Sequence, residues 1–127
     1  MTNPTYRPLE SRIQENAPQY QSEQEARIGR MLDEYDIPFF YRQARLIYRD
    51  GFHEAWYPAF TLPTYDGLVV EYAERTNTPE TQAQRTAYRA NHIPAVFVGT
   101  GDLAQPYWEP GLIARVERVY EAARARR

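Results

Sequence analysis

The chain has 127 residues, a length that fits one domain with one hydrophobic core. Charged residues make up 25% of it and the formal net charge is -2, which excludes a highly charged disordered chain and a strongly basic nucleic-acid binder. No cysteine is present, so disulfides, iron–sulfur clusters and thiolate zinc sites are excluded. Because no apolar run approaches the roughly 18 residues of a membrane span, we expect a cytoplasmic protein without a membrane partner.

The first part of the chain predicts an arm followed by a helix. Residues 1–20 hold three prolines among polar residues and predict a flexible N-terminal arm, with a single domain over residues 21–127. Ser22 and Glu25 have the spacing of a capping box, and the apolar stripe that follows them is typical of a helix. Pro38 ends this helix, because the residue before a proline avoids the helical region.

Three strands are predicted next. Residues 39–48 and 53–62 are expected to pair as an antiparallel hairpin about the turn signal Asp50-Gly51. A second turn then leads into the apolar run of residues 68–72, which has the character of a central strand.

The second half of the chain predicts a helix, a strand and a helix. Thr78 and Pro79 combine a cap with a proline at the first helical position. We expect this helix to reach about Asn91, with a face of small residues toward the sheet: Ala83, Ala87 and Ala90. Residues 93–98 predict a fourth strand, residues 99–102 a loop, and Pro110 the approximate start of a last helix. Because a helix joins the third and fourth strands, we expect a parallel pair within an α/β fold, a mixed four-stranded sheet flanked by helices.

The C-terminal end is locally basic. Residues 115–127 carry five arginines against two glutamates. Such an end is typical of a solvated helix terminus, where positive charge suits the helix dipole. Phosphate binding is the alternative interpretation.

The order αβββαβα, with Trp56-Tyr57-Pro58-Ala59-Phe60 on the second predicted strand and Val69-Val70-Glu71-Tyr72-Ala73 on the third, resembles the PD-(D/E)XK nuclease superfamily. The likeness covers about residues 22–120 and is greatest to small single-domain members of this restriction-endonuclease-like fold. In the family, an aspartate after the proline and an acid on the next strand hold Mg²⁺. A lysine two residues beyond that acid helps to orient the attacking water.

The resemblance assigns a site position to each of four residues. Glu71 matches the metal-binding acid, Ala59 stands at the aspartate position, and Ala73 stands at the lysine position. Glu25 matches a glutamate on the first helix that some members add to the site; its place in the capping box explains it equally well. Alanine at position 59 is compatible with ordinary packing or with a substituted aspartate.

The residues themselves support a site at Glu71. A glutamate within an apolar strand is costly to bury without a partner. Alternation places Glu71 and Ala73 on the same face of their strand, and the interval from Ala59 to Glu71, folded by one turn, predicts that these two lie on adjacent strands. The alternative is that Glu71 forms a structural ion pair with a nearby arginine.

The departures from the family pattern predict a degraded metal site that binds Mg²⁺ weakly or not at all. Neither Ala59 nor Ala73 offers a ligand or a proton-transfer group, and the chain has no lysine. We therefore expect a catalytically inactive nuclease-fold protein that acts in nucleic-acid or protein binding. Two alternatives stay open: an active Mg²⁺-dependent endonuclease with a rearranged site, in which Glu54 or Asp66 replaces the missing ligand, and a protein-interaction regulator from a phage or mobile element.

Overall fold

The computed structural model describes residues 18–126. Most of the predicted arm, residues 1–17, lies outside the described residues. Its last residue, Tyr20, packs edge-on against the ring of Tyr41, with the ring centroids 4.9 Å apart.

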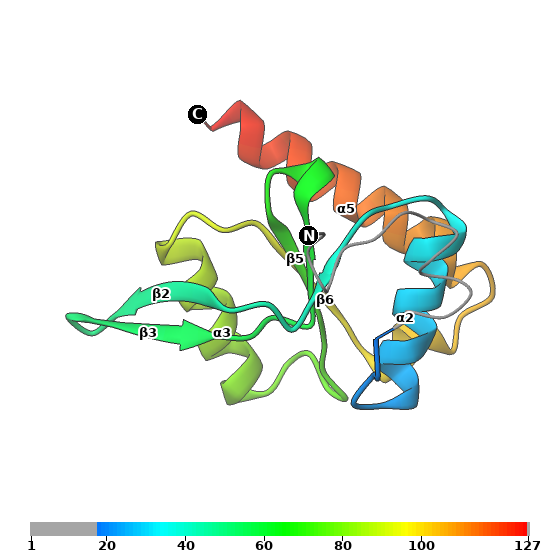
Figure 1. Cartoon of the computed structure of the whole chain (residues 1–127), viewed down its shortest axis with the longest axis horizontal. Helices are drawn as coiled ribbons and strands as arrows, with labels where there is room; N and C mark the ends of the chain where they lie inside the picture. The colour runs from blue at the N-terminus through cyan, green and yellow to red at the C-terminus, as the bar shows by residue number, and fades with distance from the viewer. Residues whose placement is uncertain (1–17, 127) are drawn as a thin grey trace, which may run out of the picture.

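A four-stranded sheet forms the centre of the described chain (Figure 1). Its order is β1-β4-β5-β6, with β1 at Phe40–Tyr41, β4 at Phe60–Leu62, β5 at Leu68–Tyr72 and β6 at Ala95–Val98. The pairs β1–β4 and β4–β5 are antiparallel, whereas β5–β6 is parallel. The prediction of a mixed four-stranded sheet is therefore confirmed.

The predicted hairpin is present in two separate parts. Its outer part is a two-stranded sheet of β2 (Arg45–Arg49) and β3 (Phe52–Trp56), and its inner part is the β1–β4 pair. The prediction of two unbroken strands is wrong, because Arg42 takes a left-handed φ of 55° and Pro58 has no N–H to donate. This break allows β2–β3 to leave the main sheet.

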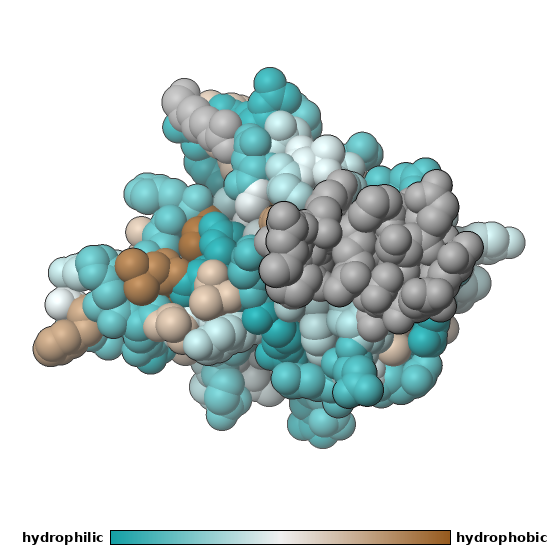
Figure 2. All heavy atoms as spheres, in the orientation of Figure 1, coloured by the Kyte–Doolittle hydropathy of each residue, from teal (hydrophilic) through white to brown (hydrophobic). Residues whose placement is uncertain are grey.

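The β2–β3 hairpin projects from the body of the molecule (Figure 1). Leu46, Tyr48 and Phe52 are exposed on it, and the brown apolar patches of Figure 2 lie mainly in this region. Asn91, which follows the helix packed behind the hairpin, accepts a hydrogen bond from the Tyr48 backbone N–H at 2.8 Å and donates to its carbonyl at 2.9 Å. One side-chain amide therefore ties the hairpin to the body through backbone atoms.

The helices start close to the predicted residues. They are α2 (Glu23–Glu34), α3 (Pro79–Ala90), the short α4 (Thr100–Leu103) and α5 (Trp108–Ala125), with a 3-10 turn, η1, at Pro63–Tyr65. Ser22 and Thr78 cap α2 and α3 as expected. One prediction needs correction: residues 100–103 are helical and not a loop. The last helix begins at Trp108, close to the expected start at about Pro110.

The predicted packing face of α3 is wrong in detail. Ala87 is buried, but Ala83 and Ala90 are exposed, and the other buried residues of α3 are Thr81 and Tyr88. The large ring of Tyr88 packs against Trp56 and Phe97, at centroid distances of 5.3 and 6.2 Å. An aromatic residue therefore occupies the place where small side chains were expected.

The core has two parts, one on each face of the sheet. One cluster joins α2 and α5 to the face that includes Val70, and the other joins α3 and the hairpin to the face that includes Val69. Because side chains alternate along a strand, Glu71 lies on the α3 side of β5. Among residues 18–126, no helix has the length and apolar character needed to cross a lipid bilayer.

Candidate functional site

Glu71 lies on an interior strand and is held by two donors. Its Oε1 accepts a hydrogen bond from the backbone N–H of Ala59 at 3.0 Å, and its Oε2 accepts one from the Tyr88 hydroxyl at 2.6 Å. The first donor comes from the segment before β4 and the second from α3. The carboxylate is therefore fixed between the sheet and the helix that covers it.

Ala59 and Glu71 meet as the sequence predicted. In the β4–β5 register Phe60 lies opposite Val70, so Ala59 and Glu71 follow directly at the same end of the pair. Ala59 is fully buried. The position that carries an aspartate in the resembling family here supplies a backbone donor to the neighbouring carboxylate.

Glu25 also turns inward, and only half of the expected capping box forms. Ser22 Oγ accepts from the Glu25 N–H at 3.1 Å, as a cap does. Glu25 is only 4% exposed, and its carboxylate accepts hydrogen bonds from the Tyr41 hydroxyl and from Nη2 of Arg42, both at 2.5 Å. The side chain therefore points away from the helix N-terminus and forms a partly buried ion pair with Arg42.

Arg42 is the charged site residue that the sequence pattern did not indicate; the hydroxyl donors Tyr41 and Tyr88 were not indicated either. The Arg42 guanidinium pairs with Glu25, donates to the carbonyl of Tyr57 at 3.3 Å, and lowers the pKa of Glu71 through its charge. The left-handed backbone at Arg42 interrupts the strand and its own N–H donates to the carbonyl of Ala59 at 3.0 Å. The sequence offered no recognised signal for this residue, because non-glycine residues seldom adopt a positive φ.

The pKa of Glu71 is raised above the usual glutamate range. Burial is the main cause, and the negative charge of Glu25 adds to it. The hydrogen bonds from Tyr88 and Ala59 and the charge of Arg42 act in the opposite direction without cancelling the effect of burial. Burial also raises the pKa of Tyr88, and the Glu71 carboxylate beside it raises it further. The charges of Glu25 and Arg42 thus both act on Glu71, and Arg42 is the cation that compensates the two carboxylates.

The other predicted site residues make their described contacts outside this cluster. Ala73 continues the pairing of β5, donating its N–H to the carbonyl of Val98 at 2.9 Å. Glu54 lies on the hairpin, paired with Arg49 at 3.0 Å and accepting from the indole of Trp56 at 2.7 Å. Asp66 has a left-handed φ of 58° in the turn before β5, at the opposite end of that strand from Glu71.

The side chains present fit the implied Mg²⁺ poorly as ligands. All four carboxylate oxygens of Glu25 and Glu71 already accept a hydrogen bond from the protein. Ala59 offers a donor where a cation needs an oxygen ligand. Among residues 18–126, no group of three His, Asp or Glu side chains is placed to hold a metal together.

Comparison of the chain with protein-family models, with curated proteins and with solved structures finds no match.

We expect Glu71→Gln to change the pH dependence of stability. Glutamine resembles the protonated carboxyl and does not titrate. In the parent, the raised folded-state pKa of Glu71 contributes stability that is fully present below the unfolded-state pKa. This contribution is lost as the pH rises through the folded-state pKa. The free energy of unfolding of the variant, relative to the parent, should therefore rise with pH across this window. Urea denaturation at a series of pH values measures it, with the exposed Glu74→Gln as control. A relative stability that falls with pH contradicts the assignment.

We expect Arg42→Ala to destabilise the protein by about 1–3 kcal/mol, because it leaves the buried Glu25 carboxylate without its cation. The lower part of this range is expected, since the Arg42 side chain is 32% exposed. Alanine keeps a Cβ at the same left-handed position, so the backbone cost is unchanged. Arg30→Ala is the matched control: its pair with Glu23 is exposed on both sides and should contribute less than about 1 kcal/mol. Equal effects in urea melts would show that Glu25 does not depend on Arg42.

Proposed function

We propose that the chain is a restriction-endonuclease-like protein in which an arginine has taken over the charge-balancing role of the metal, and that it acts by binding and not by cleavage. The observation that carries the proposal is the position of Arg42. It neutralises Glu25 directly and acts electrostatically on Glu71, the two acids that the family resemblance places in the site.

The chemistry of the cluster supports a non-catalytic role. Hydrolysis of a phosphodiester requires stabilisation of the charge that develops on the phosphate and an activated water. Arginine can balance charge but cannot transfer protons, because it stays protonated at any working pH. Its guanidinium here is engaged by Glu25, and the lysine position is occupied by Ala73. The cluster therefore resembles a structural support more than a reaction centre.

The alternative of a rearranged active site has less support. It needs Glu54 or Asp66 to supply the missing ligand beside Glu71. Glu54 is engaged by Arg49 and Trp56 on the projecting hairpin, and Asp66 belongs to the turn at the far end of β5. Nucleic acid is the partner that the family resemblance implies, and a protein partner is the second candidate.

We expect the unsubstituted protein not to cleave DNA or RNA in the presence of Mg²⁺ or Mn²⁺. A plasmid-nicking assay and a labelled single-stranded RNA measure cleavage, with an EDTA-treated sample as the blank. Arg42→Ala should also be inactive, because removal of the guanidinium adds no metal ligand at position 59. Cleavage that depends on Mg²⁺ and disappears in Glu71→Ala would overturn the proposal.

We expect Ala59→Asp to be less stable than the parent in EDTA, because it places a new carboxylate at a fully buried position whose backbone N–H donates to Glu71. Mn²⁺ should restore stability through binding, by about 2.7 kcal/mol at a metal concentration 100 times its Kd. Thermal melts with and without Mn²⁺ measure this effect. Ala55→Asp, at an exposed hairpin alanine, is the control and should show no metal dependence. Absence of metal dependence in Ala59→Asp would argue against nuclease ancestry for this pocket.

A further inference from the structure

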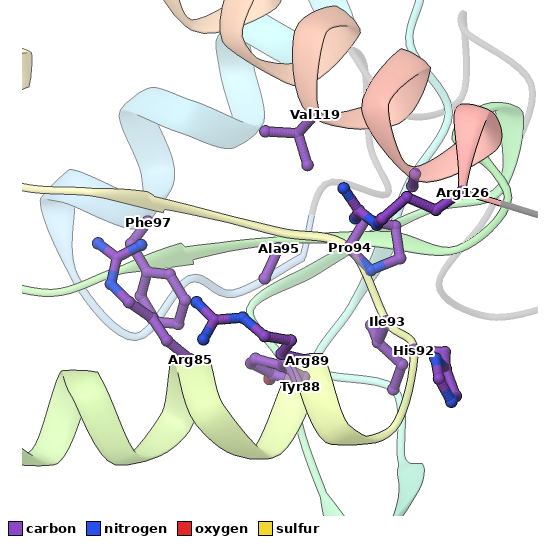
Figure 3. A pocket seen from close by; sticks show the side chains of 11 residues that line it. Arg85, Tyr88, Arg89, His92, Ile93, Pro94, Ala95, Phe97, Val119 and Arg126 are labelled. Carbon is purple, nitrogen blue, oxygen red and sulfur yellow. The ribbon is translucent and has the colours of Figure 1, made fainter.

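A groove of about 850 Å³ runs along the outer edge of β6, between α3 and α5. Figure 3 shows the strand passing between the two helices, with Arg89 reaching from α3 and Val119 from α5 toward it. The groove is separate from the carboxylate cluster, although Tyr88 borders both: it lines the groove and its hydroxyl donates to Glu71. Its position at a sheet edge determines what it can bind.

The edge of β6 offers backbone groups to an added strand. In the described part of the chain β6 is paired only with β5, and the carbonyls of Pro94 and Val98 accept hydrogen bonds from that side. Because backbone groups alternate in direction along a strand, the N–H and C=O groups of Ala95 and Phe97 point into the groove. Arg115 already donates to the carbonyl of Phe97 at 2.8 Å, so this carbonyl points away from β5, and the N–H and C=O of Ala95 and the N–H of Phe97 are the groups left for an added strand.

The groove is positively charged. Arg85, Arg89, Arg126 and His92 line it, and no acid is among the described residues that do so. Within residues 18–126 none of the three arginines forms an ion pair. The guanidinium of Arg85 lies over the ring of Phe97, 4.5 Å from its centroid, and its pKa is lowered by burial and by the neighbouring charges of Arg115 and Arg89. The positive charge of the groove is therefore complementary to a ligand with acidic groups.

We propose that this groove binds an extended acidic peptide segment of a partner protein, which adds a strand to β6. Main-chain hydrogen bonds give such an interaction its affinity, and pockets for alternate side chains give it specificity. Side chains of an added strand alternate between the two walls. Acidic residues on one side meet Arg85 and Arg89 of α3, and apolar residues on the other meet Val119 and Ala123 of α5.

A peptide explains the groove better than a nucleic acid does. Single-stranded nucleic acids bind by stacking their bases on exposed aromatic faces. The two large aromatic rings that line the groove, Tyr88 and Phe97, are each only 1% exposed, and Arg85 covers the second; the exposed ring is the small imidazole of His92. The backbone donors and acceptors of an edge strand match another extended polypeptide instead.

The test uses a fluorescein-labelled peptide of about seven residues in which glutamate and valine alternate. Fluorescence anisotropy should show saturable binding. A second peptide, N-methylated at alternate residues on its ladder-forming edge, should bind at least about tenfold more weakly. Arg89→Glu and Arg126→Glu should each weaken binding of the first peptide by about tenfold or more. Arg118→Glu, an exposed arginine of α5 that does not line the groove, is the matched control and should leave binding unchanged.

Three results would overturn the inference. The first is that the glutamate–valine peptide does not bind, which would mean that the arginines only protect the edge. The second is that the N-methylated peptide binds equally well. The third is that labelled oligothymidine binds more tightly than the peptide and loses affinity in the Arg89 and Arg126 variants. In the supporting outcome, ¹⁵N-labelled protein shows amide shifts at Ala95 and Phe97 when the peptide is added. The inference rests on the proposal that the chain acts by binding, but cleavage and peptide affinity are separate measurements. A cleaving protein that binds the peptide would refute only the proposed function.

Discussion

The fold depends on accommodating two carboxylates in a small protein: Glu25, which is buried, and Glu71, which is half-buried on an interior strand. Burial of an ionised carboxylate is tolerated only when charge and hydrogen bonds compensate for lost water. Arg42 supplies the charge, and Tyr41, Tyr88 and the Ala59 N–H supply the bonds. These donors come from α3 and from the two segments that break the hairpin. The arrangement of helix and sheet around β5 is therefore tied to the neutralisation of these two acids.

Most of the architecture could be predicted from local patterns. Ser22 and Thr78 indicate the starts of their helices because their side chains cap backbone N–H groups. The helix between residues 72 and 95 implies the parallel pair that β5 and β6 form. The strand break and the Tyr88 packing face were not predictable in this way. Both depend on contacts between distant segments: Arg42 takes its backbone conformation beside Ala59, and Tyr88 of α3 donates to Glu71 of β5.

The candidate site, like the fold, could be predicted where it depends on local sequence patterns and not where it depends on distant contacts. Alternation and turn spacing predicted that Ala59 and Glu71 would meet, because strand register is a local property. The capping-box pattern described Glu25 only in part. Its backbone is capped, but its carboxylate finds a stronger partner in a residue 17 positions away. The alternative of a structural ion pair between Glu71 and an arginine is not found among residues 18–126: Arg42 lowers the pKa of Glu71 through its charge but forms its ion pair with Glu25.

The attachment of the hairpin has a consequence for how the protein can change over evolutionary time. Asn91 holds the hairpin by the backbone of Tyr48, and Ile47 is the hairpin residue that is fully buried in the core. The outward side chains of Leu46, Tyr48 and Phe52 contribute little to this attachment. Substitutions at exposed positions of this kind usually alter stability by no more than about 0.5 kcal/mol. The hairpin therefore offers a surface whose residues can diversify under selection without endangering the fold that carries them.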